Sequence, residues 1–303
     1  MMMKNKTYHV PVLLNKCIEG LKINPSGIYV DVTFGGGGHS AEILKQITTG
    51  KLIAFDQDEE AKNNVIEDER FILIIANFSF LKNFLRLHNI NRVDGIFADL
   101  GVSSHQIDTP ERGFSTRYDS ELDLRMNTKN PLTAQHVVST YSHEELKKVF
   151  KTYGELNNAH LIANAIIKYR SEKSINTTHE LRDAVINLCQ KNKQNKFLAQ
   201  LFQALRIEVN NEIEALKELL EQSNEVLAEN GRLVILSYHS LEDRLVKNFM
   251  RSGNFEGKIE KDFYGNQQVP FELITKKPVI ADEGEVLTNN RSRSAKLRIA
   301  QKK

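Results

Sequence analysis

The chain has 303 residues, of which 40% are hydrophobic and 26% charged, and its net charge is +2. This composition excludes an intrinsically disordered chain and is typical of a globular protein with a sizeable core. No apolar run reaches the roughly 18 residues of a membrane span, and the first residues lack the apolar segment of a secretion signal. We therefore expect a cytoplasmic protein that does not contact membranes.

The cysteine and histidine content argues against a metal site. Cys17 and Cys189 are the two cysteines and lie far apart in helical patterns, so we expect buried, reduced thiols. The nine histidines show no His-x-x-x-His spacing. Without clustered ligands we predict that no metal is bound.

Basic residues gather at one end of the chain. The tail over residues 291–303 contains lysines and arginines but no acidic residue. Such a tail is usually a solubilising end, and it points to nucleic acid only if other residues indicate an RNA substrate.

Short apolar runs alternate with helical patterns through the first third of the chain. They predict strands over residues 28–32, 51–56, 71–75 and 94–99. Nearly continuous apolar strands separated by helices are typical of a parallel sheet that is covered on both faces. This region is therefore predicted to form a doubly wound α/β fold.

The pattern is helical from about residue 133 to residue 229, with a capping box at Thr177 and Glu180. Strand patterns then return at residues 231–237, 271–275 and 295–300, the last two suited to a terminal hairpin. A sheet that is interrupted by helices and then resumed predicts an inserted domain. We place the sheet domain at residues 1–108 and 209–303, and the helical insert at residues 109–208.

Four consecutive glycines, Gly35 to Gly38, separate the first predicted strand from a helix. Glycine permits a tight turn and lets a ligand lie against the backbone, and a helix start offers free N–H groups. Asp56 ends the second strand about 20 residues later, where dinucleotide folds hold ribose hydroxyls. Asp58 is better placed to cap the next helix, which leaves Asp56 for a ligand. The pattern fits NAD or S-adenosylmethionine, because both carry a ribose.

Two further acidic residues favour the methyl donor. Asp31, just before the turn, would repel a pyrophosphate but tolerates a cationic sulfonium. Asp99 ends the fourth strand, which faces the transferred methyl group in Rossmann-like methyltransferases. Methyl transfer mainly requires that the two partners be positioned. A hydrogen-bond acceptor at Asp99 would also assist a weakly nucleophilic exocyclic amine.

Eight short motifs are spread over essentially the whole chain and occupy, in order, residues 31–40, 94–104, 111–115, 122–126, 151–155, 202–207, 237–244 and 291–295. Together they resemble the motifs of the RsmH (MraW) family of 16S rRNA cytosine-N4 methyltransferases. Any single match could arise by chance, but the ordered set is specific.

The resemblance implies an α/β, Rossmann-like class I methyltransferase sheet with an inserted all-helical domain that recognises the substrate. The implied reaction transfers a methyl group from S-adenosylmethionine to N4 of a cytidine in the decoding centre of 16S rRNA, within the small ribosomal subunit. The implied donor contacts are Gly37, Gly38, His39, Asp56, Phe78, Asp99 and Gln106, and Asp99 is also the candidate catalytic residue. Phe78 and Gln106 rest on the resemblance alone.

The chain departs from the family pattern at two places. His105 stands where proline is usual, next to Gln106. Residues 156–158 lack an acidic and a basic residue that are common there, which weakens the case for an RNA contact in the insert.

Two segments allow both a structural and a functional interpretation. In residues 237–244, Ser240 and Asp243 have the spacing of a helix-capping pair, whereas His239 ends a strand and could contact the substrate. Residues 111–114 are either a solvated loop with one buried aromatic residue, Phe114, or a lid that stacks on an extruded base.

Three rival functions stay open at this point. A non-catalytic ribosome-assembly factor is disfavoured by the intact glycine turn with Asp56 and Asp99, and an NAD-dependent oxidoreductase by Asp31 and the basic tail. DNA methylation is rejected only through the family resemblance. A homodimer is compatible with the sequence, as is either free rRNA or the assembled subunit as substrate.

Overall fold

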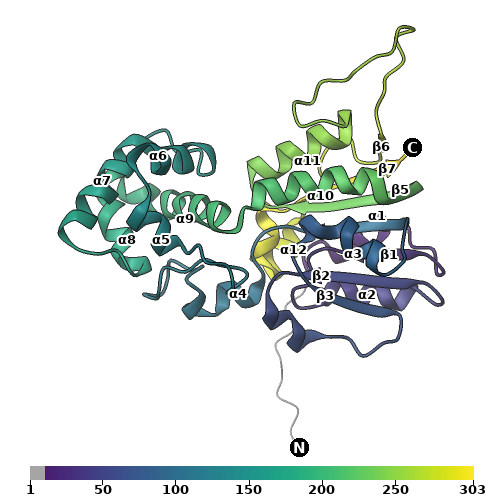
Figure 1. The fold of residues 1–303 in the computed structure, drawn as a ribbon, viewed down its shortest axis with the longest axis horizontal. Coiled ribbons are helices and arrows are strands. Elements are labelled where there is room, and N and C mark those ends of the chain that lie inside the picture. Colours follow the sequence, from purple (N-terminus) through teal and green to yellow (C-terminus); the bar gives the residue numbers. More distant parts are fainter. Residues whose placement is uncertain (1–10) are drawn as a thin grey trace, which may run out of the picture. The chain divides into compact units, whose positions relative to one another are not determined.

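The computed structural model describes residues 11–303 (Figure 1). The chain divides into two compact units, one running up to Gly101 and from Ala215 onward, the other from Val102 to Glu214. The boundaries therefore fall at 101/102 and 214/215 rather than at the predicted 108/109 and 208/209. The short helix after the fourth strand belongs to the insert, because its contacts are with the turn that follows it.

The first unit contains a seven-stranded sheet with the order β3-β2-β1-β4-β5-β7-β6. The strands are β1 (Ile28–Asp31), β2 (Lys51–Asp56), β3 (Phe71–Ile75), β4 (Val93–Asp99), β5 (Leu227–Ser237), β6 (Phe271–Leu273) and β7 (Lys296–Lys302). Strands β1 to β5 are parallel, and β7 runs antiparallel between β5 and β6. The strand order reverses between β1 and β4, which is where ligands bind in open α/β sheets.

Both faces of the sheet are covered by helices. These are α1 (Leu14–Leu21), α2 (Gly38–Gln46), α3 (Leu81–Leu87), α10 (Glu212–Val226), α11 (Ser240–Ser252) and α12 (Glu283–Thr288). Tyr29 and Phe97 pack in the core with α1 and α2, whereas their neighbours Val30 and Ile96 pack in the core with α3, α10 and α11. Because both faces of the sheet are buried, the sequences of its strands are nearly continuous apolar runs.

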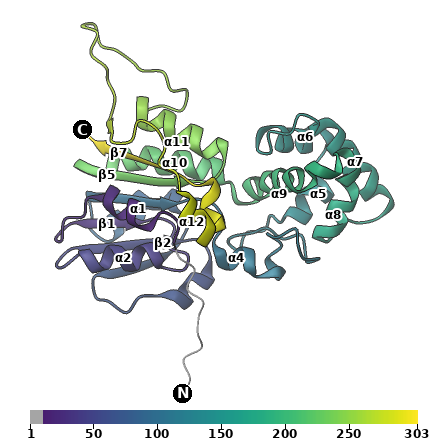
Figure 2. The ribbon, with the colours of Figure 1, turned by 180° about the vertical axis from the view of Figure 1, so that it is seen from behind.

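The second unit is helical and has a core of its own (Figure 2). Its helices are α4 (Ser104–Asp108), α5 (Ala134–Thr140), α6 (His143–Thr152), α7 (Ala159–Glu172), α8 (Thr178–Val185) and α9 (Gln194–Asn210). Helix α8 begins with the predicted capping box of Thr177 and Glu180. Across residues 11–303, no helix combines the length and the apolar character needed to cross a membrane.

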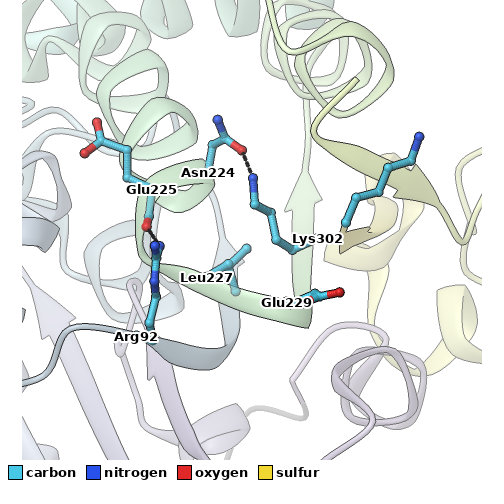
Figure 3. A pocket seen from close by; sticks show the side chains of 7 residues that line it. Arg92, Asn224, Glu225, Leu227, Glu229 and Lys302 are labelled. Atoms are coloured by element: carbon cyan, nitrogen blue, oxygen red, sulfur yellow. Dashed lines mark hydrogen bonds between the residues drawn. The ribbon is translucent and has the colours of Figure 1, made fainter. Parts of the chain in front are cut away.

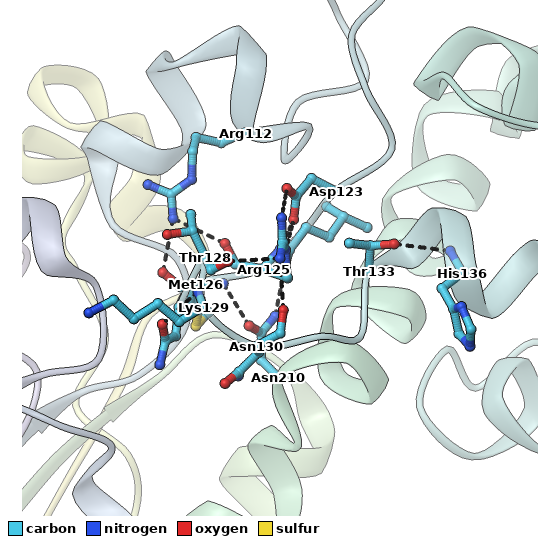
Figure 4. A network of polar contacts seen from close by, with 12 residues as sticks. Arg112, Asp123, Arg125, Met126, Thr128, Lys129, Asn130, Thr133, His136 and Asn210 are labelled. Atoms are coloured by element: carbon cyan, nitrogen blue, oxygen red, sulfur yellow. Dashed lines mark hydrogen bonds and ion pairs between the residues drawn. The ribbon is translucent and has the colours of Figure 1, made fainter.

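A polar network fixes the loop between α4 and α5 (Figure 4). The guanidinium of buried Arg112 donates to the carbonyl oxygens of Arg125 and Met126, at 3.0 and 2.9 Å. Asn210, at the end of α9, accepts from the Met126 N–H at 2.7 Å. Phe114 packs partly buried against the helical core, as the structural interpretation of this segment predicts.

The basic tail is part of the sheet. Arg298 on β7 is 7% exposed, and its Nε donates to Asp243 of α11 at 2.7 Å. Lys296 donates to the other oxygen of Asp243 at 3.2 Å. The prediction that Ser240 and Asp243 form a capping pair is therefore wrong. Asp243 pairs with the cations of β7, and the N-cap residue of α11 is His239.

Replacing Asp243 with alanine should destabilise the protein by about 3 kcal/mol, because it leaves the buried Arg298 without its carboxylate. Chemical denaturation followed by circular dichroism measures the change. Asp183→Ala is the control: its partner Arg182 is 36% exposed, so we expect a loss below about 0.5 kcal/mol. Equal losses in the two variants would contradict the assigned role of the buried pair.

Candidate functional site

The polar residues of the first unit gather at the carboxyl edge of its sheet. Asp31, Asp56 and Asp99 end β1, β2 and β4, and Ser237 ends β5. These parallel strands are neighbours, so their ends meet on either side of the point where the strand order reverses. The predicted glycine turn leaves the same edge and leads into α2.

The glycine turn is closely packed at Gly37 and Gly38 but open at Gly36. Gly37 has φ +77°, and a Cβ there would lie 3.0 Å from the ring of Phe34. A Cβ on Gly38 would lie 2.4 Å from Cγ of Pro11, so no side chain fits. A Cβ on Gly36, by contrast, would have no neighbouring atom within 4 Å. The backbone is therefore accessible from the Gly36 side.

Asp56 braces this turn. Its Oδ2 accepts from the N–H of Gly35 at 2.7 Å and its Oδ1 from the N–H of Asp58 at 2.9 Å. Asp58 caps the following 3-10 helix by accepting from Glu60, as predicted. Asp56 thus has a structural role in the turn in addition to its predicted ligand contact, which stays a prediction because each carboxylate oxygen can accept a second hydrogen bond. Burial raises the pKa of Asp56 to about 6, although the two backbone bonds oppose the shift.

Asp31 lies beneath the turn and ties three elements together. It is 1% exposed and accepts from Ser40 of α2 at 2.7 Å and from the N–H of Thr33 at 3.0 Å. The Thr33 hydroxyl in turn accepts from the N–H of Asp99 at 2.6 Å. Burial raises the pKa of Asp31. The ends of β1 and β4 and the start of α2 are thus locked in one arrangement.

Asp99 is held by a tyrosine. The hydroxyl of Tyr238, which follows β5, donates to Oδ1 of Asp99 at 2.6 Å. The Asp99 side chain is 26% exposed, so it can still reach a ligand. Burial raises the pKa of Asp99 to about 7, against the lowering effect of the tyrosine bond.

His39 lies beside Asp99 but does not neutralise it. Its Nε2 is 3.1 Å from the carbonyl oxygen of Val12, and its ring packs against Phe97 with centroids 4.5 Å apart. Because a carbonyl can only accept, Nε2 carries the proton and Nδ1, which is 3.9 Å from Asp99, has none to donate in the neutral ring. Burial lowers the pKa of His39, which favours that neutral ring.

The sequence patterns did not identify Tyr238 as a candidate site residue, although they did identify its neighbour His239. His239 caps α11 and accepts from the N–H of Glu242 at 3.4 Å, while Glu242 accepts from the N–H of Tyr238 at 2.9 Å. The strand period of two could have identified Tyr238, because Val234, Leu236 and Tyr238 all pack on the face that carries α1 and α2. The structure thus gives His239 a capping role, and its contact with substrate stays a prediction.

The two residues taken from the resemblance alone lie in different units. Phe78 follows β3 and packs partly buried against the sheet core, behind a cap in which Asn77 donates to Gln57 at 2.9 Å. Gln106 belongs to the second unit, where its buried side chain accepts from the N–H of Ser103 at 3.1 Å in a capping box. The donor contact of Gln106 therefore stays a prediction.

The strand order, the glycine turn after β1 and the acids that end β1, β2 and β4 define a Rossmann-like class I methyltransferase domain. Residues 6–303 match the model of the MraW methylase family. The chain belongs to this family.

Relatives with known names agree with this assignment over nearly the whole chain. The ribosomal RNA small subunit methyltransferase H of Flavobacterium johnsoniae is 57% identical over 296 residues, covering 97% of this chain and 98% of the relative. The protein of that name from Bacteroides thetaiotaomicron is 54% identical over 298 residues, covering 98% of each chain. A crystallised rRNA methylase from Streptococcus thermophilus aligns with 100% of this chain and 99% of its own, at 13% identity and a TM-score of 0.41.

Replacing Tyr238 with phenylalanine should raise the pKa of Asp99 above its value of about 7, because the carboxylate loses the hydrogen bond that favours its charged form. Titration of ¹³C-labelled aspartate carboxyls by NMR measures this pKa. Tyr141→Phe is the matched control, since Tyr141 donates to a different carboxylate, Glu208, at 2.8 Å. An unchanged or lower pKa in Tyr238→Phe would show that the tyrosine does not stabilise the ionised acid.

Proposed function

We propose that this protein transfers the methyl group of S-adenosylmethionine to N4 of a cytidine in the decoding centre of 16S rRNA. The observation that carries the proposal is a partly exposed Asp99, held by Tyr238 at the strand edge that also carries the glycine turn. The names of the relatives that are 57% and 54% identical support small-subunit rRNA as the substrate. The cytidine and its N4 amine come from the family resemblance and the chemistry of Asp99.

The residues of this edge fit S-adenosylmethionine. The open side of Gly36 admits a ligand against bare backbone, next to Gly37, Gly38 and His39 at the start of α2. Each oxygen of Asp56 keeps a second lone pair, which a ribose hydroxyl can use. The buried charge of Asp31 and the partly exposed charge of Asp99 favour a cationic sulfonium over a pyrophosphate. This also argues against NAD.

Phe78 and Gln106 complete the proposed donor site. Phe78 lies beyond β3, next to the end of β2, where its ring offers an apolar surface to the adenine. The proposed donor contact of Gln106 rests on the family resemblance. When bound, S-adenosylmethionine supplies an activated methyl group, so the protein needs mainly to align it with the acceptor.

Asp99 is the proposed catalytic residue. The lone pair of an exocyclic base amine is delocalised into the ring, which makes the amine a weak nucleophile. A carboxylate that accepts a hydrogen bond from this amine orients it and can take up the proton that nitrogen loses when the new N–C bond forms. Tyr238 assists by holding the carboxylate in place and by lowering its pKa.

The helical unit is the proposed recognition domain for rRNA. Its core is independent of the sheet, and its surface offers basic residues on α6 and before α9, including Lys147, Lys151 and Lys193. We expect the substrate to be rRNA within the small ribosomal subunit and the site of action to be the cytoplasm.

The direct test is transfer of labelled methyl from S-adenosylmethionine to small subunits that lack the modification, followed by identification of the labelled nucleoside. We expect N4-methylcytidine at a single site. Label on another base would support S-adenosylmethionine as the methyl donor but contradict cytidine as the methylated nucleoside. Measurable donor binding without any transfer would favour a ribosome-assembly factor.

The same assay tests Asp99. Asp99→Asn should reduce transfer at least about 100-fold, because the amide is a poorer acceptor and cannot take up the proton. Glu221→Gln, which changes an exposed carboxylate on α10 of the sheet unit, is the control and should retain full activity. Near-normal methyl transfer by Asp99→Asn would show that another group accepts the hydrogen bond and the proton of the target amine.

A further inference from the structure

A long loop joins α11 to β6 and extends away from the sheet (Figure 1, Figure 2). It carries two exposed aromatic residues. Phe263 is 99% exposed and Tyr264 is 86% exposed. Their rings meet edge to face, with centroids 5.7 Å apart. Neighbouring aromatic residues that are left in water contribute little to folding, and such pairs are typical of interaction sites.

The tip of the loop is a turn that is held by its own hydrogen bonds. Asp262 accepts from the N–H groups of Tyr264 and Asn266, both at 2.9 Å, and its own N–H donates to the Asn266 carbonyl at 3.0 Å. Gly265 closes the turn with φ +86°. Nearer the base, Asn248 of α11 donates to the Phe255 carbonyl at 2.8 Å. The two aromatic side chains are therefore presented by a folded turn.

A cationic hollow of about 550 Å³ lies at the base of this loop (Figure 3). Its cations are Arg92, Lys302 and Lys303, and its other lining residues are Asn224, Glu225, Leu227 and Glu229. Arg92 donates to the backbone carbonyl of Glu225, and Lys302 donates to the Asn224 amide oxygen at 2.5 Å. The Glu225 carboxylate is paired with Lys82. Within residues 11–303, none of the three cations pairs with a carboxylate, so their charge is available to an external anion.

The hollow adjoins the end of the loop, where the chain enters β6. The N–H of Lys303 donates to the carbonyl of Pro270 at 3.0 Å, and Nζ of Lys302 lies 5.6 Å from the centroid of Phe271, where the loop enters β6. We call Arg92, Phe263, Tyr264, Lys302 and Lys303 the amino-edge surface, because β4, β5 and β6 begin here and β7 ends here. Asp99 ends β4, which at roughly 3.3 Å per residue lies about 20 Å from the start of that strand.

We propose that the amino-edge surface binds an unpaired segment of RNA, with a base stacked on Phe263 or Tyr264 and phosphates at the cations. Aromatic rings accept any base by stacking, and lysine or arginine side chains hold the backbone without reading sequence. Unpaired cations at the base of the loop, together with exposed aromatic rings farther along it, favour a polyanion with stacking bases over a protein partner. The assignment of this RNA to the small ribosomal subunit rests on the proposed function. Because of its distance from Asp99, this surface contacts a segment other than the methylated nucleotide.

Two double variants test the proposal, Phe263→Ala with Tyr264→Ala and Lys302→Gln with Lys303→Gln. Each should raise the KM for unmodified small subunits about tenfold, with kcat and the affinity for S-adenosylmethionine unchanged. The lysine variant should also bind with a weaker dependence on salt, since it releases fewer counterions.

Matched controls remove equivalent groups elsewhere on the first unit. Ile280→Ala with Leu287→Ala removes apolar side chains that are 66% and 87% exposed. Lys16→Gln with Lys45→Gln removes two exposed lysines from α1 and α2. Both controls should keep the wild-type KM. A KM in the test variants equal to that of the controls would overturn the proposal.

Crosslinking identifies the occupant. A photoreactive side chain introduced in place of Phe263 should label rRNA in small subunits, whereas labelling of a ribosomal protein would overturn the assignment to RNA. If the wild-type protein transfers no methyl group, the proposed function fails but this surface is still tested. Fluorescence anisotropy with an unstructured RNA 12-mer should then show weaker binding by both test variants, and unchanged binding would contradict the proposal.

Discussion

The hydrogen bond from the Tyr238 hydroxyl to the Asp99 carboxylate is the interaction on which the proposed chemistry depends. Within residues 11–303 no lysine or arginine pairs with Asp99, and burial lowers the pKa of the neighbouring His39, which favours its neutral form. The tyrosine therefore supports the charged acid without cancelling its charge. Such an acid can attract a cationic donor and accept from an amine, whereas a salt-bridged acid would be largely neutralised.

The strand order makes this interaction possible. β4 lies between β1 and β5, so Thr33 from one neighbour and Tyr238 from the other both reach Asp99. The buried Asp31 and the bracing Asp56 then fix the glycine turn against the same edge. At the opposite edge of the sheet lies the hollow lined by Arg92, Lys302 and Lys303, and the loop with the two exposed aromatics enters β6 there. Under the two proposals, methyl transfer takes place at one edge of this sheet and RNA binding at the other.

Local sequence patterns predicted the local structure well. The strands at residues 51–56 and 71–75, the glycine turn and the Thr177 capping box all follow from apolar runs, glycines and cap residues. Long-range pairings were not accessible in this way. The attraction of Asp243 to Arg298 joins residues 55 positions apart, and the contact of Tyr238 with Asp99 joins residues 139 positions apart. Several residues in each neighbourhood could make such bonds. The sequence patterns therefore indicated His239 as the candidate functional residue, whereas it is Tyr238 that contacts Asp99.

The most direct test of the role of Asp99 compares the affinities for S-adenosylmethionine and S-adenosylhomocysteine, which lacks the positive charge, by calorimetry between pH 6 and pH 8. The pKa of Asp99 is about 7, so the acid gains its charge across this range. The preference for the cationic donor should therefore rise with pH in the wild-type protein and stay constant in Asp99→Asn. A wild-type preference that does not change with pH would show that the Asp99 carboxylate does not face the sulfonium.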